Sequence, residues 1–159
     1  MGTKNTDLVA NFEATPQVPN NAAELHGVLR VAQGTVELAA GDSDNNDIVM
    51  LAPIPSNASV PQLFIGSDTL GGSCTFNVGI YTTAGAVKDE DVFATAVADA
   101  GAMADVRFEA ANINTAGQKM YELAGDSTDP GGYYYIAATM AADGGTAGTM
   151  SWNITYVIN

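Results

Sequence analysis

The chain has 159 residues, of which 47% are apolar and only 14% are charged, and this composition suits one globular domain with a buried core. Eighteen acidic residues against five basic ones give a net charge of −13, and no cluster of Lys or Arg offsets it, so we expect neither nucleic acid nor a membrane as a partner. A single cysteine, Cys74, excludes an internal disulfide and a zinc site built from cysteines.

Residues 1–24 are polar and are interrupted by Pro16 and Pro19, which predicts an extended N-terminal arm ahead of one domain over residues 25–159. In an assembly such an arm often lies across a neighbour, so Phe12, Pro16 and Pro19 are candidate contact residues. The N-terminus has no apolar signal region, and no span approaches transmembrane length. We therefore expect synthesis in the cytoplasm without export by an ordinary signal.

From Leu25 onward, apolar residues recur at every second position, which predicts β-strands. Leu29 and Val31 share one face of the first strand. The run Ile48–Ile54 (IVMLAPI) is apolar throughout, as is typical of a strand buried on both sides. Further alternating rows predict strands in the segments 62–67, 74–81, 106–110 and 119–123.

The segment that begins at Asp89 has a different pattern. It is rich in Ala, has acidic residues at its start, and spaces Val92, Phe93 and Val97 at roughly helical intervals. Acidic side chains near a helix N-terminus interact favourably with the helix dipole. The sequence therefore predicts a short helix near residues 89–98.

Two alternating runs end the chain, GGYYYIAATM and TMSWNITYVIN. Trp152 lies in register with Met150 and Ile154, so we assign it to the core rather than to a sugar-binding platform. Tyr133 and Tyr135 fall on the face opposite Tyr134, where they would cover a second sheet or a partner subunit. With about eight or nine strands and regular turn signals, the chain is predicted to be all-β, an antiparallel β-sandwich of jelly-roll type.

Candidate catalytic and metal-binding residues are few. The only histidine, His26, has no nucleophile motif beside it, so we predict no catalytic residue and no enzyme activity. Calcium favours oxygen ligands at alternate positions, as in the sequence Asp42, Asp44, Asn46, Asp47. This run lacks the glycine and the closing glutamate of a calcium loop, however, which favours a solvated turn. We therefore predict no bound metal and no cofactor.

Most of the chain after the arm resembles small structural proteins of tailed-bacteriophage virions. The resemblance lies in GVLRVAQGTVELAAGD, IPSNASV, LFIGSD, CTFNVGIYTTAG, DEDVFATAV and the last 29 residues from GGYYY onward. It implies a β-sandwich or jelly-roll capsid decoration (cement) protein or a related head protein, located on the capsid surface. The implied partners are the major capsid protein or other virion proteins, and a homo-oligomer, with a trimer favoured. The alternative is a carbohydrate- or receptor-binding module of a head fibre or tail.

Overall fold

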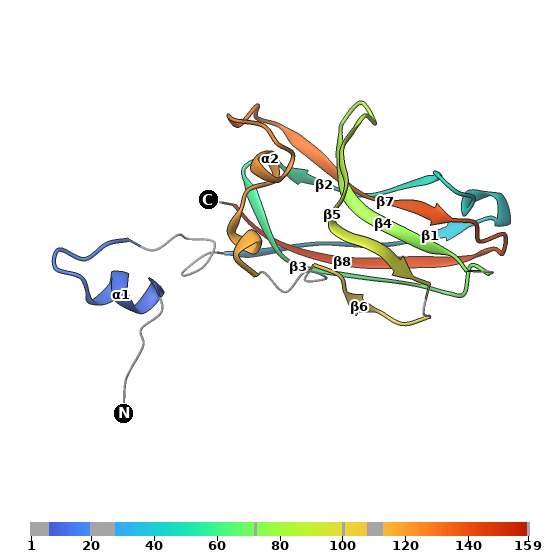
Figure 1. Cartoon of the computed structure of the whole chain (residues 1–159), viewed down its shortest axis with the longest axis horizontal. Helices are drawn as coiled ribbons and strands as arrows, with labels where there is room; N and C mark the ends of the chain where they lie inside the picture. The colour runs from blue at the N-terminus through green and yellow to red at the C-terminus, as the bar shows by residue number, and fades with distance from the viewer. Residues whose placement is uncertain (1–6, 20–27, 72, 100, 108–112, 159) are drawn as a thin grey trace.

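Two four-stranded antiparallel sheets face each other in the computed structural model, which describes residues 7–19, 28–71, 73–99, 101–107 and 113–158 (Figure 1). Sheet A has the strand order β1 (Leu29–Leu38), β8 (Gly148–Ile158), β3 (Ala58–Ser67), β6 (Ala104–Asp105). Sheet B has the order β2 (Ile48–Pro55), β7 (Tyr133–Ala142), β4 (Thr75–Thr82), β5 (Val87–Ala98).

The strand order has a simple rule. The first strand pairs with the eighth, the second with the seventh, the third with the sixth and the fourth with the fifth. A chain folded back on itself and then rolled into two sheets produces this order, which is that of a jelly roll. The predicted all-β sandwich is therefore confirmed.

Short helical segments lie outside the sheets. They are α1 (Asp7–Glu13), η1 (Ala40–Asp42), η2 (Ile113–Gly117) and α2 (Met120–Leu123). The first of them, α1, lies away from both sheets, inside the range that was predicted to be extended (Figure 1). Within the described parts of the chain, no helix has the length and apolar character needed to cross a membrane.

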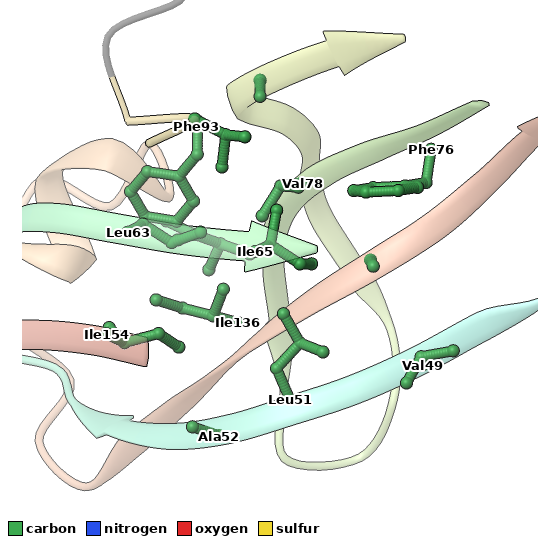
Figure 2. Close-up of a cluster of buried hydrophobic side chains, with 14 of the residues drawn as sticks. Val49, Leu51, Ala52, Leu63, Ile65, Phe76, Val78, Phe93, Ile136 and Ile154 are labelled. Carbon is green, nitrogen blue, oxygen red and sulfur yellow. The ribbon is translucent and has the colours of Figure 1, made fainter. Parts of the chain in front are cut away.

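The core fills the space between the sheets. Leu63 and Ile65 of β3, together with Ile154 of β8, meet Val78 and Ile136 from sheet B, and all five are almost fully buried (Figure 2). Cys74 is also buried in this core, and burial raises the pKa of its thiol.

The predicted helix near residues 89–98 is wrong, because this segment is strand β5. Its pairing with β4 contains register shifts, and Glu90–Phe93 lie opposite the single residue Gly79. The extra residues let both Phe93 and Ala94 point into the core. The bulge in β5 therefore spaces its apolar residues in the sequence as a helix would. Pairing with β4 outweighs the helix propensity of the alanines in β5.

Residues 119–123, predicted as a strand, instead begin with one isolated bridge from Lys119 to Ser59 and then form α2. The carboxylate of Glu122 accepts the backbone N–H of Lys119 at 2.8 Å, which caps this turn of helix. Met120 and Ala124, one turn apart, are both buried. In the segment 106–110, Val106 and Arg107 lie outside β6, and residues 108–110 lie outside the described residues.

Candidate functional site

The apolar run of β2 is an edge strand with one face exposed, so its predicted burial on both sides is wrong. Ile48 and Met50 are 44% and 39% exposed, and Pro53 is exposed as well. A β-bulge at Leu51 points both Leu51 and Ala52 into the core and so keeps Pro53 on the outer face.

Strand β7 places its tyrosines beside these residues. Pro53 pairs with Tyr135 and Pro55 pairs with Tyr133, so their side chains share the outer face of sheet B. Tyr133 is 57% exposed and Tyr135 is half-buried, whereas Tyr134 is buried in the core. The alternation predicted for these three tyrosines is confirmed. We call this surface the tyrosine face, and it comprises Ile48, Met50, Pro53, Tyr133 and Tyr135.

Buried residues on the same outer face of sheet B lie next to the tyrosine face. Tyr81 pairs with Tyr135, and its hydroxyl exchanges a hydrogen bond with the hydroxyl of Thr139. Ala137, midway between Tyr135 and Thr139 on the same face, is fully buried. Strand pairing and the buried hydrogen bond between Tyr81 and Thr139 fix the backbone beside the tyrosine face. We therefore expect this face to change little in shape when it binds a partner.

The chemistry of the tyrosine face differs from that of the rest of this acidic molecule. None of its five residues is charged, and Tyr and Met are both enriched in protein interfaces. Contiguous exposed apolar patches mark interaction sites in soluble proteins. Pro53 and Pro55 lack backbone N–H groups, so this edge resists pairing with another strand, and a partner at this face would be bound through side chains.

Sequence reasoning identified Tyr133 and Tyr135 but missed Ile48, Met50 and Pro53. The continuous apolar run suggested a buried strand. The signal that could have corrected it was Pro53 within the run and Pro55 just after it, since proline inside a sheet is confined to edges and bulges.

The acidic turn at Asp42–Asp47 uses its side chains to cap its own backbone. The carboxylate of Asp42 accepts the N–H of Ala39 at 2.9 Å, and that of Asp47 accepts the N–H of Asp44 at 2.9 Å. Asn46 has a left-handed φ of 73°, a conformation that asparagine tolerates in turns. Across the described ranges, no three His, Cys, Asp or Glu residues are grouped so that they could hold a metal ion.

Pro16 and Pro19, two of the N-terminal candidates, do not belong to the tyrosine face. Pro16 and Pro19 are exposed in the segment after α1. Phe12 lies within α1, but its side chain is outside the described residues, as is His26. Trp152 packs against the core as predicted and lies over Gly34 of the neighbouring strand.

Three solved phage capsid structures contain chains that are similar to this one over most of their length. A chain in the capsid of Ralstonia phage GP4 is 20% identical with a TM-score of 0.51, and the match covers 84% of this chain and 86% of that one. Chains of the cyanophage Pam1 capsid (15% identity, TM-score 0.45, coverage 84% and 86%) and of the Helicobacter pylori bacteriophage KHP30 capsid (13%, 0.41, 82% and 88%) are also similar.

No protein-family model matches this sequence, and no curated protein matches it. The likeness to the GP4 chain is a likeness of fold, at an identity where residue roles do not transfer.

Proposed function

We propose that this protein is a non-enzymatic structural protein of a tailed-phage virion, and that it decorates the capsid by binding the major capsid protein through the tyrosine face. The fold shared with a chain of the GP4 capsid supports the virion role. The observation that carries the attachment is the uncharged apolar face on an otherwise strongly acidic chain. Many copies on a lattice would let a modest contact act collectively.

The arm and the oligomer belong to the same proposal. Residues 1–24 would serve as an arm that contacts a neighbouring subunit, with the remainder as one domain. The protein would form a homo-oligomer, with a trimer favoured, and the mass measured by light scattering during size-exclusion chromatography tests this. A monomer at all accessible concentrations would contradict it.

Attachment can be tested with two matched methionine variants. We expect Met50→Ser to weaken binding to purified particles by at least about tenfold, because serine removes a large apolar side chain from the tyrosine face. Met103→Ser, which changes an exposed methionine elsewhere, should bind as the unsubstituted protein does. Binding is measured by co-sedimentation with particles that lack the endogenous copy.

Two results would contradict this proposal. Absence of the protein from purified particles would overturn the virion role. Equal binding of the Met50 and Met103 variants would overturn the assignment of the tyrosine face.

A second candidate function uses the same surface, because an exposed tyrosine such as Tyr133 can stack on a sugar ring. The protein would then be a carbohydrate- or receptor-binding module. A glycan array that compares the unsubstituted protein with Tyr133→Ala and Tyr135→Ala separates the two. Sugar binding that both variants lose would favour the module over the decoration role.

A further inference from the structure

Among the described residues, no strand pairs with the outer edge of β1, which is long. The two sheets have four edge strands among the described residues, namely β1 and β6 in sheet A and β2 and β5 in sheet B. Strand β6 has only two residues, β2 carries two prolines and a bulge, and β5 has several register shifts in its pairing with β4. Strand β1 has ten residues, no proline and no register shift.

A regular edge strand is a template for another strand. Alternate residues of β1 direct their N–H and C=O groups away from β8, its one partner in sheet A. Among the described residues, no backbone hydrogen bond reaches this edge from outside the sheet. Proteins usually protect such edges with prolines, bulges or short strands, and the other three edges of this fold have these features.

Apolar side chains are exposed along β1. Leu29 and Val31 are 63% and 55% exposed, although the sequence pattern grouped them as an apolar face. The inner row of this strand is instead the one that contains Ala32, Val36 and Leu38, which pack against the core. Within the described parts of the chain, the strand thus combines exposed apolar side chains on its outer face with an edge that no other strand pairs.

A groove of about 380 Å³ lies between the Leu38 end of β1 and the start of β2. Val36, Leu38, Ile48 and Met50 contribute an apolar surface to it. This groove is continuous with the tyrosine face, because Ile48 and Met50 belong to both.

Three acidic residues, Glu37, Asp42 and Asp47, also line the groove, and no basic residue does. Their carboxylates accept hydrogen bonds from neutral groups, the hydroxyl of Thr149 for Glu37 and backbone N–H groups for the two aspartates. Within the described chain, the one ion pair is formed elsewhere, between Lys88 and Asp126. The negative charge of the groove is therefore available to a cationic ligand.

We propose that the β1 edge and the adjoining groove bind an extended segment of another protein, one that alternates apolar residues with Lys or Arg. Main-chain hydrogen bonds to β1 would give affinity, apolar side chains would fill the groove, and cationic side chains would pair with Glu37, Asp42 and Asp47. A second copy of this chain does not fit, because none of its five basic residues has another within a strand-length segment. The inference rests on the proposed virion function only for the source of the segment, which would be a neighbouring virion protein.

The probe is a short synthetic peptide that alternates Val with Lys and Thr, added to the full chain at about 0.15 M salt, where charges more than about 8 Å apart are screened. We expect calorimetry to detect binding, and hydrogen exchange to show slower exchange of the outward amides of β1. A peptide with Glu in place of Lys should not bind. A peptide N-methylated at alternate residues should not bind either, since it cannot donate the strand hydrogen bonds.

The matched variants test the charge of the groove. Glu37→Gln should weaken binding of the Lys peptide about two- to fivefold, as expected for one exposed ion pair. Asp91→Asn, an exposed acid on β5, should leave binding unchanged. Absence of binding, equal binding of the N-methylated peptide, or protection confined to other strands would each overturn the proposal. None of these outcomes bears on whether the protein is found in particles, so the two proposals fail separately.

Discussion

Arg107 is a buried cation held by backbone oxygens. Its Nε donates to the carbonyl of Val60 at 2.8 Å and its Nη2 to the carbonyl of Thr115 at 2.7 Å, while the guanidinium lies 5.1 Å from the centre of the Phe93 ring. Desolvation lowers the pKa of Arg107, yet arginine stays charged at any ordinary pH. This one side chain therefore connects the segment after β6, strand β3 and η2.

We expect Arg107→Lys to destabilise the protein by about 1–3 kcal/mol, because lysine cannot reproduce the planar donor fork and leaves a buried carbonyl without its partner. Arg30→Lys, at an exposed position, should change the free energy of unfolding by less than about 0.5 kcal/mol. Urea denaturation monitored by circular dichroism measures both. Equal stability of the two variants would show that the guanidinium hydrogen bonds of Arg107 contribute nothing to the free energy of unfolding.

At the scale of elements, the bulged crossing of β5 over β4 depends on a glycine. A Cβ atom on Gly79 would lie 2.1 Å from the carbonyl oxygen of Asp89 and 2.3 Å from the carbonyl carbon of Glu90. Both are backbone atoms, which cannot move aside as a flexible side chain can. The absence of a side chain at Gly79 therefore permits β5 to fold over the outer face of sheet B.

Gly79→Ala should destabilise the protein by about 1–3 kcal/mol, because the backbone of β5 has to shift. Gly41→Ala is the matched control, since no atom lies within 4 Å of the position that its Cβ would take. This control should be neutral or should stabilise by up to about 1 kcal/mol through the unfolded state. Thermal unfolding of both variants measures the difference, and a neutral Gly79→Ala would contradict the close crossing.

For the whole molecule, one cluster that joins β5, the loop after α2 and β7 contributes to stability at both acid and alkaline pH. Lys88 forms an ion pair of 2.8 Å with Asp126, and the hydroxyl of Tyr134 donates to the same carboxylate. The hydrogen bonds from Lys88 and Tyr134 lower the pKa of Asp126 below its ordinary 3.8. Burial, with this hydrogen bond, raises the pKa of Tyr134 to about 12.

The signs of these shifts predict stability against pH. The contribution of Asp126 is present above pH 3.8 and is lost as pH falls through its lower folded pKa, because the unfolded chain binds the proton more readily. The contribution of Tyr134 is present below its ordinary pKa of 10 and is lost as pH rises toward about 12. We expect Asp126→Asn to reduce the loss of free energy of unfolding at acid pH, measured by urea denaturation over a range of pH values. A loss as large as that of the unsubstituted protein would contradict this.

The predictability of the candidate site differs from residue to residue. Tyr133 and Tyr135 could be placed on an outer face because alternation within one strand fixes which residues share a face. Met50 and Ile48 could not, because apolar residues at successive positions look the same in a central strand and in an edge strand. Which of the two they occupy depends on whether another strand pairs beside them, and that strand comes from a distant part of the chain.

The sequence by itself determined the all-β class, the two alternating runs at the end of the chain and the core rows around Leu63, Val78 and Ile154, since a two-residue period is a local property. It did not determine that these two runs lie in different sheets, β7 in sheet B and β8 in sheet A, and do not pair with each other. Only the tertiary structure decided that residues 89–98 form a bulged strand, that Arg107 is buried, and that β1 and β2 are edges. These features depend on register, bulges and strand order, which arise from pairing between segments far apart in the chain. The proposed contact surfaces follow from strand order, because edges and outer faces exist only once the two sheets have assembled.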